Sequence, residues 1–218
     1  MIDWNAIDEV FLDMDGTLLD LHFDNYFWRE HLPARYAQIN GVSAKEVRDD
    51  LHGRYQRMRG TLDWYCLEYW QTTLAVDIVD LKKELMQKIQ FRPGAEAFLQ
   101  WLKRSDKRVT LVSNAHRWSI DLKFEHLQMH PYFDQVCSAH DYGYPKEDQR
   151  FWQCFQQQSG FNPERTVFID DNLEVLDSAD KFGIAQLFAV QLPDLTGPVL
   201  EPSKYTQVID FEALTDGR

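Results

Sequence analysis

The architecture of this chain follows from Val10-Phe11-Leu12-Asp13-Met14-Asp15-Gly16-Thr17. An apolar run that ends abruptly in two carboxylates is typical of a buried parallel strand with functional groups at its carboxyl end. Gly16 allows the backbone to turn sharply after this strand. We therefore expect Asp13 and Asp15 to emerge together at one edge of a sheet.

The same Asp-x-Asp-Gly pattern also begins calcium-binding loops of the EF-hand type. Here, however, the sixth loop position is Leu18 rather than glycine, and the twelfth is Asp24 rather than glutamate. A strand rather than a helix precedes the loop. These mismatches argue against a calcium site.

Further apolar runs that end in polar residues occur along the chain, and predicted helices separate them. Runs at 109–112 and 167–169 precede Ser113 and Asp170, and 135–138 and 185–188 are further predicted strands. Right-handed crossovers would arrange such strands as a doubly wound parallel α/β sheet, with its ligand crevice at the carboxyl ends of the strands. The predicted helices cover residues 94–104, 118–128, 149–158 and 173–182.

Residues 21–90 break this alternation, because they show helical periodicity without a convincing buried strand. Ser43, followed by Glu46, predicts the start of a helix inside this segment. We interpret 21–90 as a helical cap domain inserted after the first strand, and 1–20 with 91–218 as the catalytic α/β core. The tail from Pro193 is predicted to be irregular and receives no chemical role.

The ends of three predicted strands carry a concentration of acidic and polar side chains. Asp13 and Asp15 end the first, Ser113-Asn114 another, and Asp170-Asp171 a third. Four carboxylates at one edge would repel one another unless a cation or a shared proton were present. Oxygen ligands of this kind favour Mg²⁺. Lys146 would add one positive charge, although an isolated lysine is more often a solvated surface residue.

This ordered set resembles the motifs of the haloacid dehalogenase superfamily: Asp-x-Asp-Gly-Thr, Ser-Asn, an isolated Lys and Asp-Asp. The resemblance spans nearly the whole chain and implies a phosphatase. It implies that Asp13 is the nucleophile and Asp15 the general acid and base. Ser113 and Asn114 would bind the phosphoryl group, and Lys146 would neutralise charge.

The resemblance also implies a magnesium site. Asp13, the backbone carbonyl of Asp15, and Asp170 would bind the ion, and Asp171 and Thr17 would support these ligands from outside. The dehalogenase branch generally lacks the second aspartate of the motif. The presence of Asp15 therefore favours a phosphatase.

Two features concern the substrate. The phrases Asp24-Asn25-Tyr26-Phe27-Trp28, Trp64-Tyr65-Cys66-Leu67 and Gly143-Tyr144-Pro145-Lys146-Glu147-Asp148-Gln149-Arg150 resemble those of the bacterial GMP/IMP nucleotidases, a cap-bearing branch of this superfamily. The resemblance implies hydrolysis of purine 5'-monophosphates.

Aromatic rings of the cap could stack on a purine, although rings at helical spacing are usually core residues. His22 and Arg54 are candidates for polar contacts with the base. The aromatic residues in question are Phe23, Tyr26, Phe27, Trp28, Trp64, Tyr65, Tyr69 and Trp70.

Alternatives stay open at this point. The same motifs would serve a phosphatase of small metabolites such as phosphoglycolate or sugar phosphates, or a mutase like β-phosphoglucomutase. A non-catalytic binding module is a third class, but loss of the nucleophile or the acid would mark it, and both Asp13 and Asp15 are present.

Composition limits the partners. The net charge of −12 disfavours nucleic acids and acidic membranes, so we expect a small phosphate ester as substrate. Cys66, Cys137 and Cys154 show neither a disulfide framework nor zinc-ligand spacing. Without a recognisable targeting or membrane segment, we expect a cytoplasmic monomer.

Overall fold

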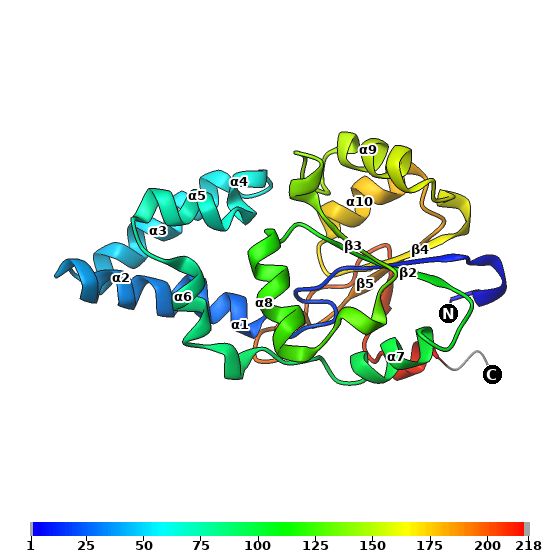
Figure 1. The fold of residues 1–218 in the computed structure, drawn as a ribbon, viewed down its shortest axis with the longest axis horizontal. Helices are drawn as coiled ribbons and strands as arrows, with labels where there is room; N and C mark the ends of the chain where they lie inside the picture. The colour runs from blue at the N-terminus through cyan, green and yellow to red at the C-terminus, as the bar shows by residue number, and fades with distance from the viewer. Residues whose placement is uncertain (1, 216–218) are drawn as a thin grey trace.

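A computed structural model describes residues 2–215 and contains one six-stranded, fully parallel sheet (Figure 1). The strand order is β3-β2-β1-β4-β5-β6, so the order reverses at β1, where doubly wound folds place their ligands. The predicted fold class is therefore confirmed. The strands are β1 (Glu9–Leu12), β2 (Arg108–Ser113), β3 (Gln135–Ser138), β4 (Thr166–Asp170), β5 (Gln186–Val190) and β6 (Thr206–Val208).

Helices cover both faces of the sheet, and the side chains of β1 alternate between them. Val10 and Leu12 belong to a hydrophobic core that includes α7 (Ala95–Leu102) and α8 (Arg117–Leu127). Phe11, between them, belongs to a second core with α9 (Gln149–Ser159) and α10 (Leu173–Phe182). In Figure 1, α9 and α10 lie above the sheet and α7 lies below it. Burial on both faces explains the continuous apolar run that predicts β1.

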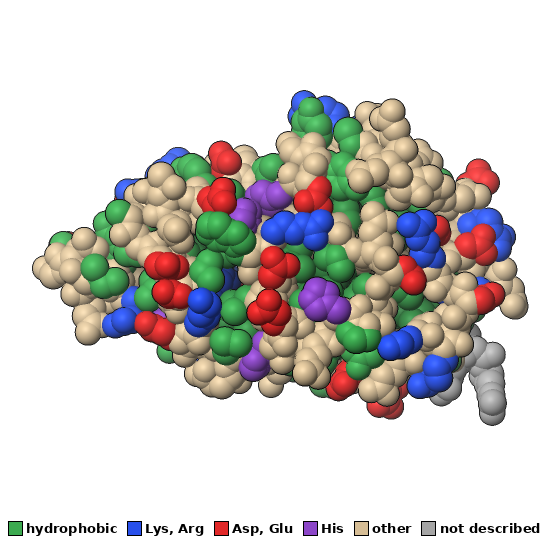
Figure 2. Space-filling model, in the orientation of Figure 1, with side chains coloured by type: hydrophobic (Ala, Val, Ile, Leu, Met, Phe, Trp, Pro, Cys, Tyr) green, Lys and Arg blue, Asp and Glu red, His purple; other side chains and the backbone are tan. Residues whose placement is uncertain are grey.

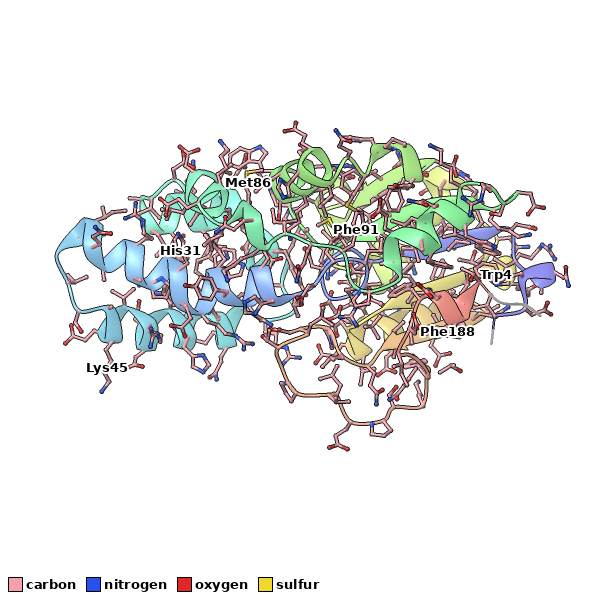
Figure 3. All side chains as sticks on the ribbon, turned by 90° about the horizontal axis from the view of Figure 1, so that it is seen from below. Trp4, His31, Lys45, Met86, Phe91 and Phe188 are labelled. Atoms are coloured by element: carbon pink, nitrogen blue, oxygen red, sulfur yellow. The ribbon has the colours of Figure 1, made fainter. Side chains whose placement is uncertain are left out.

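A helical insertion lies between β1 and β2, within the predicted cap at 21–90, and extends away from the sheet in Figure 1. Ser43 caps its longest helix, α3, by accepting a hydrogen bond from the Glu46 amide. The cap boundaries themselves stay a prediction. In Figure 3, Lys45 lies at the end of the insertion far from the sheet. The insertion contains α1 (His22–Tyr26), η2 (Phe27–His31), α2 (Leu32–Asn40), α3 (Ala44–Met58), α4 (Leu62–Tyr65), α5 (Leu67–Leu74), α6 (Ile78–Lys83) and η3 (Met86–Lys88).

The two segments that connect the insertion to the sheet are hydrogen-bonded to each other. The Asp20 amide donates to the Gln90 carbonyl over 3.1 Å, and the Arg92 amide donates to the Leu18 carbonyl over 2.9 Å. These bonds fix the point at which the insertion leaves and rejoins the sheet. Asp13 and Asp15 lie just before it in the chain.

The prediction of an irregular tail is wrong in part. Residues 206–208 form β6, which pairs in parallel with β5, and Glu212–Leu214 form a short 3-10 helix. The sequence Thr206-Gln207-Val208 has little apolar character, so β6 depends on the hydrogen bonds that β5 offers rather than on its own pattern. None of the described helices is long and apolar enough to span a membrane.

Candidate active site

The carboxyl ends of β1, β2 and β4 bring the predicted site residues together. Leu12 aligns with Leu111 of β2 and with Ile169 of β4, so the residues that follow these positions reach the same sheet edge. Asp13 and Asp170 are therefore neighbours, and Ser113, one residue farther along β2, reaches the same edge, as expected for parallel strands in register. All of the predicted site residues at this edge except Thr17 line a single cavity: Asp13, Asp15, Ser113, Asn114, Lys146, Asp170 and Asp171.

Lys146 is buried at the centre of this edge. Its Nζ atom donates to Asp13 Oδ1 over 2.6 Å, to Asp170 Oδ2 over 2.7 Å and to the Val112 carbonyl over 3.0 Å. Burial lowers the pKa of Lys146, but the two carboxylates outweigh burial and raise it overall. Lys146 is thus a fixed cation rather than a solvated surface residue.

The side chain of Asn114 holds this lysine and a neighbouring acid. Its Oδ1 accepts from the Lys146 amide over 2.8 Å, and its Nδ2 donates to Glu147 over 2.9 Å. Glu147 also accepts from the Tyr65 hydroxyl over 2.9 Å, and so connects the insertion to the sheet. Sequence reasoning missed Glu147, because a lone glutamate in a loop carries no distinguishing signal.

Three carboxylates form a compact acidic group beside Lys146. Oxygen atoms of Asp13, Asp170 and Asp171 all lie within 4.8 Å of one another. Burial raises the pKa of Asp13 to about 6, with Lys146 opposing the shift. Burial, then Asp170 and then Asp13, raises the pKa of Asp171 well above its usual range. Three acids against one lysine leave an uncompensated negative charge, and an all-oxygen donor set of this kind suits Mg²⁺.

Gly16 is required for the close approach of the acidic group to the loop after β1. Its φ is +86°, and an added Cβ would lie 2.6 Å from Asp171 Oδ2. Any other residue would be strained and would collide with that carboxylate. Thr17, the next residue, is fully buried, and its Oγ1 has no hydrogen-bond partner among residues 2–215.

Asp15 belongs to a second, charge-balanced group. Lys123 of α8 donates to Asp15 Oδ1 and to Asp24 Oδ2, each over 2.6 Å, and Lys82 of α6 donates to Asp24 Oδ1 over 2.7 Å. Burial raises the pKa of Asp15 to about 6 against the opposing effect of Lys123. Asp24 has a lowered pKa, because its two lysines outweigh the raising effect of burial. Two acids and two lysines neutralise each other here without a metal.

Sequence reasoning missed this second group, although one signal was present. Lys123 lies on the same helical face as the buried Ile120, three residues before it, and Leu127, four residues after it, which also packs against the core. A lysine on an apolar face must find a buried partner, since an unpaired buried charge is costly. The identity of that partner, Asp15, is not encoded in the local pattern.

The cavity has a volume of about 690 Å³ and runs from the acidic edge to the inner side of the insertion. Three of the cap aromatic residues that were predicted to stack on a base line the cavity: Trp28, Trp64 and Tyr65. Tyr55, which was not predicted, lines it as well. Phe23, Phe27 and Trp70 are instead buried core residues. Polar side chains of the insertion also line the cavity, among them Arg29, His52, Gln56 and Arg59.

His22 and Arg54, the predicted polar contacts with the base, are not among the described residues that line the cavity. His22 Nδ1 lies 2.9 Å from Thr196 Oγ1, on the loop after β5. Arg54 pairs with Asp50 over 2.9 Å on the same helix. Helix α3 instead turns His52 and Gln56 toward the cavity, and Arg59, which ends the helix, also lines it. Helix orientation of this kind cannot be read from residue type.

Comparison with known proteins agrees with this geometry. A family model described as haloacid dehalogenase-like hydrolase matches residues 7–183. GMP/IMP nucleotidase YrfG of Escherichia coli strain K12 is 42% identical over 193 residues, which cover 88% of this chain and 87% of that protein. The protein of the same name from Shigella flexneri gives the same values. Among solved structures, an HAD phosphatase from Thermococcus onnurineus superposes with a TM-score of 0.79 at 19% identity, covering 95% of this chain and 96% of that one.

Proposed function

Since the chain belongs to the haloacid dehalogenase-like hydrolase family, we propose that it hydrolyses purine nucleoside 5'-monophosphates, GMP and IMP above all, to nucleoside and phosphate. The observation that carries this proposal is the position of Asp13 and Asp15 at the floor of a cavity whose upper walls are aromatic. A curated relative at 42% identity that is named a GMP/IMP nucleotidase supports the choice of substrate.

The carboxylate of Asp13 is the proposed nucleophile. It would attack phosphorus to form an aspartyl phosphate, while the bond from phosphorus to the nucleoside oxygen breaks. Asp15 would give its proton to that oxygen and later take a proton from the water that hydrolyses the intermediate. With a pKa raised to about 6, Asp15 can serve in both protonation states near neutral pH.

We assign Mg²⁺ to the acidic group. Asp13 and Asp170 would bind it, together with the backbone carbonyl of Asp15, and Thr17 would support the loop. Asp171, predicted from the sequence to support these ligands from outside, has an oxygen within 4.8 Å of both carboxylates and would join them as a ligand. The bound ion supplies positive charge that stabilises the phosphoryl oxygens. Lys146, which pairs with Asp13 and Asp170, supplies a further positive charge from the protein itself. Ser113, buried at the end of β2 beside the nucleophile, is the proposed hydroxyl donor to the phosphoryl group.

The walls of the cavity support a purine in preference to a small ester. Trp28, Tyr55 and Trp64 offer aromatic faces for a base, and stacking of this kind contributes about 1–3 kcal/mol per base. GMP and IMP share an acceptor oxygen at position 6, where AMP carries an amino donor. Arginine is a good donor to that oxygen and to N7, and Arg29 and Arg59 line the cavity.

The test is phosphate release from a panel of GMP, IMP, AMP, CMP, phosphoglycolate and sugar phosphates, each with Mg²⁺ and with a chelator. We expect GMP and IMP to be the best substrates and chelation to abolish turnover. A preference for a small ester would contradict the substrate while leaving the chemistry in place. Transfer of the phosphoryl group within a sugar phosphate, without phosphate release, would instead indicate a mutase.

A further inference from the structure

Cys66, His116 and His140 meet at the junction between the insertion and the sheet. Each offers a ligand atom, and these atoms lie within 4.8 Å of one another. Cys66 separates α4 from α5, His116 precedes α8, and His140 lies in a 3-10 helix after β3. Figure 2 shows histidine side chains in the region where the insertion meets the sheet. Three distant segments thus place one sulfur and two imidazoles together, outside the acidic group of the active site.

His140 already has the arrangement of a metal ligand. Its Nε2 atom is buried and has no hydrogen-bond partner in the described part of the chain. A neutral imidazole can present the lone pair of such an unpartnered nitrogen to a cation. Burial, and then His116, lowers the pKa of His140 to about 4, so the ring is neutral at pH 7.

The other two residues are also suited to binding. Burial lowers the pKa of His116, and its ring lies edge-on to that of His140 with centroids 5.0 Å apart. His116 Nδ1 accepts a bond of 3.4 Å from the Trp118 amide, which is too long to fix the tautomer. Cys66 Sγ accepts from the Tyr69 amide over 3.4 Å, and a metal-bound sulfur can keep such a bond.

We propose that Cys66, His116 and His140 form a second metal site, for a borderline-soft divalent cation of the zinc class, with a fourth position open to water. One sulfur and two imidazole nitrogens favour zinc over magnesium. Zn–S and Zn–N bonds of about 2.3 and 2.0 Å would require the three side chains to draw together by roughly 1 Å. The negative charges of Glu68 and Asp63 lie close enough to act on the two rings and would attract a cation.

The position of this site gives it a mechanical consequence. Cys66 belongs to the helical insertion, and both histidines belong to the segments that follow strands of the sheet. One ion bound by all three would connect the insertion directly to the sheet. His116 also lines the active-site cavity, so the connection would lie at the cavity wall.

The test uses Co²⁺ as a spectroscopic substitute for Zn²⁺, with excess Mg²⁺ to occupy the carboxylate site. The full chain should bind one Co²⁺ with a thiolate-to-cobalt charge-transfer band, and Zn²⁺ should displace it. Cys66→Ser should abolish the band. His140→Gln should weaken Co²⁺ binding by roughly 100-fold, because mutation even of residues that only hydrogen-bond to a metal ligand lowers metal affinity by about 10- to 100-fold. The matched controls, Cys154→Ser and Asp13→Asn, should bind Co²⁺ as the wild type does.

A second readout needs no variant and therefore does not depend on folding of Cys66→Ser. Cys66 and Cys154 are both partly exposed, so iodoacetamide can reach them. Zn²⁺ should slow alkylation of Cys66 and leave that of Cys154 unchanged, as mass spectrometry of tryptic peptides would show. Absence of the band, its persistence in Cys66→Ser, or equal alkylation of Cys66 with and without Zn²⁺ would overturn the proposal. These measurements do not depend on turnover, so a failed nucleotidase assay would leave them valid.

Discussion

Lys123 donates a hydrogen bond to Asp15 over 2.6 Å, and the same amine donates to Asp24 over the same distance. The proposed general acid is thereby joined electrostatically to the first helix of the insertion. Lys82 then pairs with the other oxygen of Asp24. The charge on Asp15 therefore depends on residues from α8, α1 and α6, which only the folded chain brings together.

Lys123→Met should impair both stability and turnover. Removing one partner of a buried pair leaves uncompensated carboxylates and costs about 3–5 kcal/mol. Loss of the positive charge should raise the pKa of Asp15, so its base form is scarcer at neutral pH. We expect kcat to fall by about 100-fold and the pH–rate profile to move to higher pH. Urea unfolding and phosphate release measure both effects. Lys103→Met, at an exposed lysine, should change neither.

Asp13→Asn should abolish turnover and leave the fold intact. An amide of the same shape cannot form the aspartyl phosphate, and we expect at least about a 1,000-fold loss of kcat. The substitution also removes one negative charge from a group in which three carboxylates face a single lysine. Repulsion among the carboxylates should fall, so the free energy of unfolding in the presence of chelator should not decrease. Phosphate release and thermal unfolding are the measurements. Retained activity in the folded variant would rule out the covalent mechanism.

Arg29→Met should weaken the preference for 6-oxo purines. If the guanidinium donates to O6 or N7 of the base, its loss should reduce the GMP-over-AMP ratio of kcat/KM by about tenfold. A tenfold change corresponds to about 1.4 kcal/mol, within the roughly 1–3 kcal/mol that a good bidentate contact to a base contributes. Arg48→Met is the control, because Arg48 pairs with Glu30 and is not among the described cavity residues. An equal loss of kcat/KM for every nucleotide would instead indicate that Arg29 recognises the phosphate or the general shape of the substrate.

His140 should make stability depend on pH in metal-free buffer. The unfolded chain binds a proton at this residue below its ordinary pKa of 6.5, whereas the folded chain binds it only below about 4. The stabilising contribution is therefore complete above pH 6.5 and is lost as the pH falls toward 4. His140→Gln should remove this dependence, about 1–2 kcal/mol once partial exposure is allowed for. Urea unfolding at pH 7 and pH 5 measures it, and His126→Gln, at an exposed histidine, should behave as the wild type.

The sequence alone determined five of the six strands, the helical insertion and the group of polar residues at the carboxyl edge of the sheet. Each depends on local information: an apolar run predicts a buried strand, and parallel strands in register bring their carboxyl ends to one edge. Asp13, Ser113 and Asp170 could be grouped for that reason without knowledge of any contact.

Only the tertiary structure decided which distant side chains meet. The pairing of Lys123 with Asp15, the turning of Gln56 rather than Arg54 toward the cavity, and the grouping of Cys66 with two histidines all depend on how separate elements pack. The spacing of the cysteines in the sequence indicated no metal site. The ligands of the proposed site come from three separate segments, so they form no local spacing pattern. Local patterns encode whether a side chain is buried, but the direction and distance between packed elements determine its partner, and these are set by the fold as a whole.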